Sequence, residues 1–191
     1  MQSTTSPGFW RVADGTPVPA AEAYAAWGQA AYPVLTEVAS QYHGWITYGD
    51  LGERVQRETG IRTRQLLTHW IGIVLAHVVH EAHRCGDAPL TALAVDRTGR
   101  VGSGYDLILK VAGQPVIEDD VVREDHAKFA RYRCYQQFCL SMPPDGGVAV
   151  LTPPLAEARS RAKVRETAAP PPTCATCFIQ LPASGICDTC A

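Results

Sequence analysis

Four of the seven cysteines lie in the C-terminal segment TCATCFIQLPASGICDTCA, which covers residues 173–191. They form two C-x2-C pairs with nine residues between the pairs: Cys174, Cys177, Cys187 and Cys190. Each pair bends back to present two thiolates, and two pairs complete the tetrahedral shell that Zn²⁺ prefers. A shell made of four thiolates leaves no open coordination position, so the spacing predicts one structural Zn²⁺ rather than a catalytic one.

The alternative for this segment is a disordered tail with free, reduced thiols. So short a segment buries too little apolar surface to fold without a metal. The loop between the pairs is shorter than the usual fifteen to twenty residues or so, which favours a minimal zinc ribbon or knuckle. Because residues 174–191 contain no lysine or arginine, we expect the knuckle to dock a protein partner rather than to bind phosphates alone.

A second group of potential metal ligands lies in HVVHEAHR, residues 77–84. On a helix, His77, His80 and Glu81 would stand at positions i, i+3 and i+4, near enough for one metal ion. This spacing keeps a metal-dependent nuclease or hydrolase open as an alternative, although it is not the H-E-x-x-H zinc signature. His77 and Glu81 also fall within the apolar arc of the helix, so we favour a buried, hydrogen-bonded pair at this position.

Arginines provide the third candidate site. In a winged helix, arginines near a helix junction and at the tip of a hairpin would contact DNA phosphates from two elements. The candidates are Arg54, Arg57, Arg62, Arg64, Arg97 and Arg100. The alternative is a solvated surface on which these arginines pair with Glu53, Glu58 and Asp96.

The composition describes an ordinary globular chain. A formal net charge of −2 and a hydrophobic content of 46% give no overall signature for nucleic acid or membrane binding, so any basic patch must be local. The chain lacks a secretory signal and any long apolar run, and we expect a cytoplasmic protein without a membrane partner. The odd and uneven set of cysteines argues against a disulfide framework.

The elements that must position these residues are mainly helices. Apolar periodicity predicts helices at residues 20–40, 48–59, 63–84, 118–138 and 155–167. Pro33 is expected to kink or split the first of them. Thr47 as N-cap and Gly60 as C-terminal stop bound the second. The third, with apolar residues over more than half of its circumference, is the expected central buried helix.

Two strands complete the expected fold. LTALAV at residues 90–95 and YDLILKV at 105–111 read as buried strands that form a hairpin with a basic, glycine-rich tip. The fold class is therefore α+β: a mainly helical body with a winged-helix-like unit and a small β-hairpin, plus a C-terminal zinc knuckle. The expected organisation is an extended arm at 1–19, a globular domain at 20–167, a proline-rich linker at 168–173 and the knuckle at 174–191.

Two phrases in residues 45–105 carry a resemblance to a known family. WITYGDLGERV and PLTALAVDRTGRVGSGY resemble the start of the helical unit and the glycine-rich wing in the DNA-binding domain of the alkylguanine alkyltransferase and alkyltransferase-like family. The resemblance implies a winged helix-turn-helix that binds double-stranded DNA. The family's Pro-Cys-His-Arg or Pro-Trp-His-Arg phrase has no counterpart, because Pro89 is followed by Leu90, Thr91 and Ala92, so alkyl transfer is not implied.

The leading hypothesis is a non-enzymatic, DNA-binding regulatory protein whose structural zinc knuckle docks a partner. One alternative is a protein–protein adaptor that does not bind DNA. The other is a metal-dependent nuclease or hydrolase that uses His77, His80 and Glu81.

Overall fold

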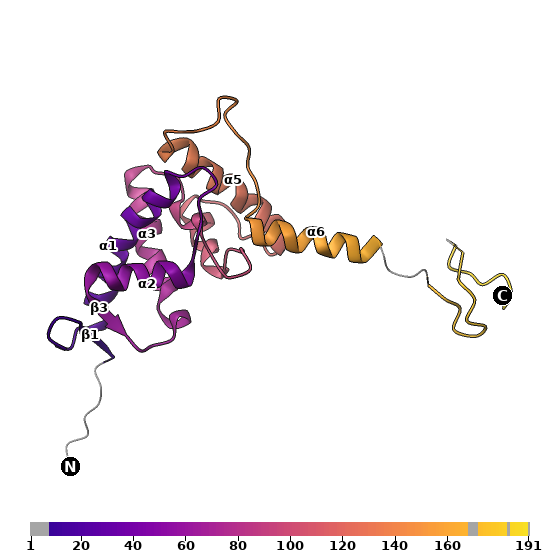
Figure 1. Ribbon diagram of the computed structural model, residues 1–191, viewed down its shortest axis with the longest axis horizontal. Coiled ribbons are helices and arrows are strands. Elements are labelled where there is room, and N and C mark those ends of the chain that lie inside the picture. Colours follow the sequence, from indigo (N-terminus) through magenta and orange to yellow (C-terminus); the bar gives the residue numbers. More distant parts are fainter. Residues whose placement is uncertain (1–7, 168–171, 183, 191) are drawn as a thin grey trace, which may run out of the picture. The chain divides into compact units, whose positions relative to one another are not determined.

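The computed structural model describes residues 8–167, 172–182 and 184–190. The chain divides into two compact units, Met1–Leu155 and Ala156–Ala191, which we call the body and the C-terminal unit. The described residues form six α-helices and two small, two-stranded sheets, so the α+β class with mostly helical content is confirmed (Figure 1). No helix among these residues has the length and apolar character needed to cross a membrane.

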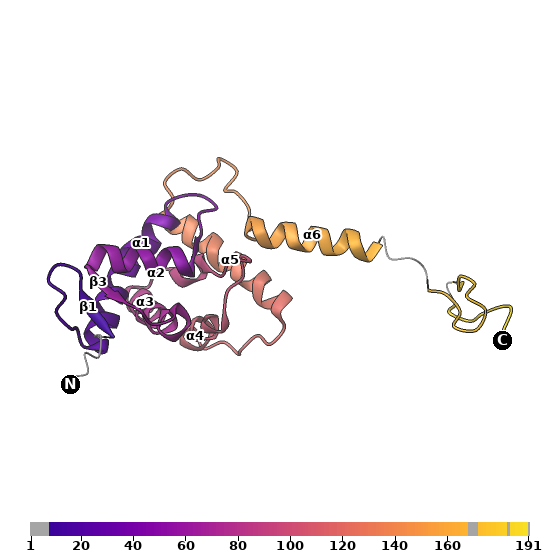
Figure 2. The ribbon, with the colours of Figure 1, turned by 60° about the horizontal axis from the view of Figure 1, so that its bottom comes forward.

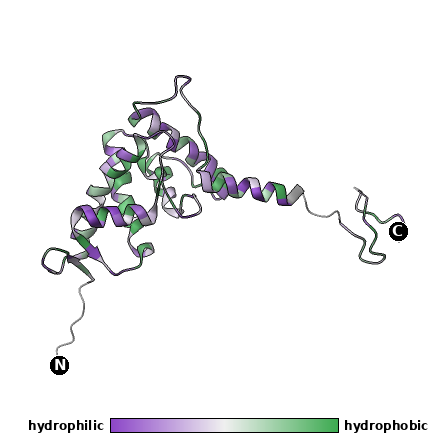
Figure 3. Cartoon of the chain, in the orientation of Figure 1, coloured by the Kyte–Doolittle hydropathy of each residue, from purple (hydrophilic) through white to green (hydrophobic). Residues whose placement is uncertain are grey.

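The centre of the body is a pair of apolar helices, α1 (Ala20–Ala39) and α3 (Ile71–Cys85). Hydrophobic colouring runs along both helices, whereas α2 and α5 are mostly hydrophilic (Figure 3). Helix α1 is a single element that continues through Pro33. Trp27 on α1 meets Trp70 at the start of α3 with ring centroids 4.5 Å apart, and both side chains are buried. These contacts fix how α1 and α3 pack.

Helix α2 (Tyr48–Thr59) has the bounds that the capping residues predict. The Thr47 hydroxyl accepts a hydrogen bond of 3.0 Å from the Asp50 main-chain N–H, and Gly60 ends the helix with a φ of 67°. Leu51 and Val55 are fully buried, so one face of α2 belongs to the core. Figure 2 shows α2 beside α1, as Figure 1 does.

The N-terminal region contributes to the body. Strand β1 (Phe9–Arg11) pairs antiparallel with β3 (Ile61–Thr63). Phe9 and Val18 are buried, and the Phe9 ring lies 5.4 Å from that of Tyr24. Of the arm expected at 1–19, residues 1–7 lie outside the described residues, whereas residues 9–18 supply part of the core.

The expected helix at 63–84 begins later in the structure. Strand β3 is followed by a short 3₁₀ helix (Leu67–His69), and α3 starts at Ile71. The prediction that the next helix starts at residue 63, separated from α2 by only three residues, is therefore wrong. The reason is tertiary: the pairing of β3 with β1 buries Ile61 and holds this segment extended.

The predicted hairpin of residues 90–95 and 105–111 is also wrong. Residues Leu90–Leu93 form a 3₁₀ helix, and strand β4 (Ala94–Val95) pairs in parallel with β2 (Ile46–Thr47). The second segment is a 3₁₀ turn (Ser103–Tyr105) followed by helix α4 (Asp106–Val111). Tyr105, Ile108 and Leu109 are the buried residues there, which is helical spacing rather than alternation. The described part of the chain therefore lacks the second wing strand, and with it the hairpin that a winged helix requires.

Two further helices follow. Helix α5 (Asp120–Phe138) begins at Asp119, whose carboxylate accepts hydrogen bonds from the N–H groups of Val121 and Val122. Helix α6 (Pro153–Thr167) contains the boundary between the body and the C-terminal unit. Of the linker expected at 168–173, residues 168–171 lie outside the described residues.

Candidate metal centre and arginine surface

The two C-x2-C pairs meet in the C-terminal unit. The four sulfur atoms of Cys174, Cys177, Cys187 and Cys190 all lie within 4.8 Å of one another, and those of Cys177 and Cys187 are 3.4 Å apart. Zn–S bonds of about 2.3 Å in a tetrahedron place the sulfurs roughly 3.8 Å apart. The expected proximity of the four cysteines is confirmed, and their geometry fits one metal ion.

Short main-chain hydrogen bonds shape the first pair. The Cys174 N–H donates to the Ile179 carbonyl at 2.7 Å, and the Phe178 N–H donates to the Cys174 carbonyl at 2.9 Å. Phe178 takes a left-handed backbone conformation with a φ of 57°, which closes the turn. The chain therefore bends back after Cys177, as a C-x2-C ligand pair requires.

The four sulfur atoms do not share one acidity. Main-chain N–H groups of Cys177 and Thr176 lower the pKa of Cys174 to about 6. The Ile179 N–H favours the Cys177 thiolate, but the neighbouring sulfurs of Cys187 and Cys190 outweigh it and raise the pKa of Cys177 to about 11. Crowded thiols cannot all ionise unless a cation compensates them. A divalent metal at the centre of the cluster would supply that charge.

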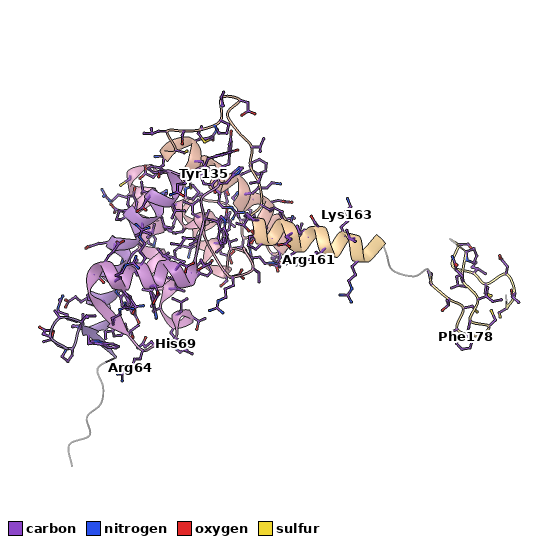
Figure 4. All side chains as sticks on the ribbon, in the orientation of Figure 1. Arg64, His69, Tyr135, Arg161, Lys163 and Phe178 are labelled. Carbon is purple, nitrogen blue, oxygen red and sulfur yellow. The ribbon has the colours of Figure 1, made fainter. Side chains whose placement is uncertain are left out.

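The described residues of this cysteine knuckle (174–182 and 184–190) expose three large apolar side chains and include no lysine or arginine. Phe178, Ile179 and Ile186 are 79%, 53% and 61% exposed. Figure 4 shows Phe178 at the outer edge of the knuckle. Three large apolar side chains are thus exposed to solvent on a small module.

Apart from Arg54, which lies in the middle of α2, the candidate arginines divide into two groups at opposite ends of this helix. The parallel pairing of β2 with β4 brings the turn that carries Arg97 and Arg100 beside the start of α2, where the Gly102 N–H donates to the Tyr48 hydroxyl at 2.7 Å. Arg62 and Arg64 follow the other end of the helix, in β3 and the residue after it. A helix of this length spans about 18 Å. The structure thus places one group at each end of α2.

Acidic side chains pair with several of these arginines. Arg54 contacts both Glu37 and Glu58. Arg62 lies 3.9 Å from Glu53, and Arg100 lies 3.8 Å from Asp120. Such pairs are the surface arrangement expected of solvated charges, and each contributes little stability.

The remaining candidates differ in their surroundings. The Arg64 guanidinium lies 5.5 Å from the centre of the Trp10 ring, on the segment between α2 and α3 (Figure 4). Arg57 and Arg97 are exposed. Asp96, which we expected to pair with an arginine, instead accepts hydrogen bonds from the N–H groups of Thr98 and Arg100 and shapes the turn.

The histidine group on α3 is exposed, so the expected buried pair of His77 and Glu81 is wrong. His77 and His80 are exposed, and the Glu81 carboxylate binds the Arg84 guanidinium at 2.6 Å. In the part of the chain that the structure describes, the four cysteines are the only cluster of three or more potential metal ligands. The expectation failed because the core-facing arc of α3 is narrower than its apolar residues suggest.

One further site was not found in the sequence. A cavity of about 210 Å³ lies in the body, lined by residues that include His83, Asp87, His126 and Arg133. His83 lies on α3 and Asp87 just after it, whereas His126 and Arg133 lie on α5, and no spacing pattern connects the two regions. Only the packing of α3, α4 and α5 brings them together.

No protein-family model matches the chain, and neither a curated protein nor a solved structure matches it. The resemblance to the alkyltransferase DNA-binding domain therefore has no support from a family match.

Proposed function

We propose that this protein is a non-enzymatic interaction protein that holds one structural Zn²⁺ in its cysteine knuckle and docks a partner protein through the knuckle surface. The exposure of Phe178, Ile179 and Ile186 on a four-cysteine module carries the proposal. A closed thiolate shell has no position for a substrate, so the metal serves folding. The exposed apolar side chains then supply contact area, and the absence of basic residues disfavours nucleic acid as the knuckle's ligand.

Site-specific photocrosslinking in cells of the source species tests this proposal. A benzophenone amino acid would replace Phe178 in one variant and Leu140 in a matched control, because Leu140 is the corresponding fully exposed apolar residue of the body. We expect one discrete protein adduct from position 178, no such adduct from position 140, and loss of the adduct when Cys174→Ser is added. Equal adducts at both positions, or an adduct that survives Cys174→Ser, would contradict docking through the folded knuckle.

A second candidate function is DNA binding by the body, in line with a regulatory role. It is favoured by the placement of two arginine groups at the ends of α2, among which Arg57 and Arg97 are exposed. In this reading the paired arginines exchange their acidic partners for phosphates on binding.

Charge reversal separates this candidate from an adaptor that binds only protein. We would compare two double variants of the same net charge. The first combines Arg57→Glu and Arg97→Glu, and the control combines Arg11→Glu and Arg84→Glu. DNA binding through the α2 ends predicts weaker duplex binding and a shallower salt dependence for the first variant only, since fewer counterions are released. An unchanged affinity for duplex DNA, or an equal loss of affinity in both variants, would contradict DNA binding through the ends of α2.

A further inference from the structure

The cavity in the body has the size of a small-molecule site. Its volume of about 210 Å³ lies between α3, α4 and α5. An apolar cavity of about 150 Å³ in another protein is large enough to bind benzene. Val79, Ile108 and Ala130 supply apolar wall, and all three are at least nine-tenths buried. The cavity, which is open to solvent on one side, can therefore hold a ring or a short aliphatic chain.

Arg133 on α5 gives this cavity a permanent positive charge. Its side chain lines the cavity, and among the described residues no carboxylate forms an ion pair with it. The ring of His126 also lines the cavity, and its Nδ1 lies 2.7 Å from the Tyr105 hydroxyl. Burial, together with the Arg133 charge, lowers the pKa of His126. The imidazole is therefore neutral at pH 7, and Arg133 remains as the cation.

One carboxylate also lines the cavity, but other groups engage it. Asp87 accepts a hydrogen bond of 2.5 Å from the Gln137 side-chain N–H and another from the Tyr32 hydroxyl. These donors stabilise its negative charge from outside the cavity lining, because neither Gln137 nor Tyr32 is a lining residue. Asp87 is thus engaged by its own neighbours, whereas the exposed Arg133 guanidinium has no ion-pair partner among the described residues.

We infer that this cavity binds a small organic anion, whose apolar part lies against Val79, Ile108 and Ala130 and whose carboxylate or phosphate group contacts Arg133. An arginine fork matches the two oxygens of such a group, and charge-assisted hydrogen bonds of this type are the strong ones. The ligand would be the size of a substituted benzene ring. This site is separate from the cysteine knuckle and does not depend on the function proposed for it.

Three probes that share a fluorophenyl ring would test the inference in the full-length protein. They are para-fluorobenzoate, para-fluorophenyl phosphate and para-fluorobenzyl alcohol, and fluorine NMR would follow their binding. We expect saturable binding of at least one anion, and weaker binding of the alcohol. The stronger of the two anions shows whether the site prefers a carboxylate or a phosphate.

Two variants locate the binding. Arg133→Gln removes the charge at an exposed position, so the fold is retained, and it should weaken anion binding by roughly tenfold to a hundredfold while leaving the alcohol unaffected. Ala82→Leu fills the cavity and should abolish binding of all probes, with circular dichroism as the check of its fold. Arg84→Gln is the matched control for lost charge and should leave binding unchanged.

The inference is overturned if neither anion binds the wild-type protein, if the alcohol binds as tightly as both anions, or if Arg133→Gln and Arg84→Gln have the same effect.

Discussion

Cys174 and Cys177 show that two identical side chains in one cluster can differ widely in pKa. Main-chain N–H groups lower the pKa of Cys174 to about 6, whereas neighbouring sulfurs raise that of Cys177 to about 11. Without a metal, the cluster therefore retains protons at neutral pH. With Zn²⁺ bound, all four sulfurs are thiolates.

This difference predicts the pH dependence of metal binding. The metal-bound state carries fewer protons than the metal-free state, at least at Cys177, so a fall in pH favours the metal-free state. We expect the zinc affinity to fall by about tenfold per pH unit for each proton displaced, between about pH 8 and about pH 6. Competition with a chelating dye, calibrated at each pH, measures it. An affinity that stays constant over this range would contradict four-thiolate binding.

Gly28 on α1 allows the close approach of α3. A Cβ atom at this position would lie 2.5 Å from the Cβ atom of His77. Gly28→Ala should therefore lower the free energy of unfolding by about 1–3 kcal/mol, because the two helices must separate. Gly72 on α3 is the matched control, since a Cβ atom there would meet no described atom within 4 Å beyond its chain neighbours and its own helix backbone.

For Gly72→Ala we expect the opposite sign, a stabilisation of up to about 1 kcal/mol, because alanine restricts the unfolded chain and favours the helix. Urea denaturation of both variants provides the measurement. Equal effects of the two substitutions would show that the α1–α3 contact is not tight at Gly28.

At the scale of elements, α5 is anchored through a buried charge. Glu124 and Arg131 are only 2% and 1% exposed, and their side chains approach to 3.9 Å. The Glu124 carboxylate also accepts a hydrogen bond of 2.7 Å from the Val101 N–H, and the Arg131 guanidinium donates to the Ala92 carbonyl. The pair thus ties α5 to the chain on both sides of β4.

Glu124→Gln should weaken this anchor strongly. The amide keeps the shape of the side chain but leaves the Arg131 charge buried without its counter-charge, which costs about 3–5 kcal/mol of unfolding free energy. Glu81→Gln removes one partner of an exposed ion pair on α3 and should cost less than about 1 kcal/mol. Thermal and urea unfolding would measure the free energy of unfolding of both variants. A similar, small loss in both variants would mean that the buried pair contributes no more than a surface pair.

The elements also show where the sequence pattern was insufficient. The capping signals at Thr47 and Gly60 predicted the bounds of α2, because both act on neighbouring residues. The apolar run at 105–111 fits both a strand and a short helix, and the choice depended on which residues face α3 and α5. Strand β4 pairs with β2, nearly fifty residues earlier, and no local pattern encodes that pairing.

At the scale of the whole molecule, the body and the C-terminal unit should depend on different interactions. The body has a core of buried apolar side chains. All four potential metal ligands of the knuckle lie at 174–190, in the C-terminal unit. Loss of the metal should therefore unfold the knuckle and leave the stability of the body unchanged.

Cys177→Ser tests this separation. We expect one zinc per chain in the wild type, none in this variant, and an unchanged thermal midpoint of the body. The exposed Cys85 on α3 is outside the cluster, so Cys85→Ser should retain the zinc. Metal analysis and amide NMR spectra would measure both effects. Retained zinc in Cys177→Ser, or signals of the body that shift together with those of the knuckle, would contradict the prediction.

The sequence by itself determined the candidate metal ligands and the bounds of α2. Ligand spacing and capping act over a few residues, so both can be read from neighbouring positions in the chain. Only the tertiary structure decided the helical state of 106–111, the exposure of His77, the contact of Arg54 with Glu37, and the cavity beside Arg133. Each of these depends on contacts between residues distant in sequence, and their free energy exceeds the small differences between local conformations.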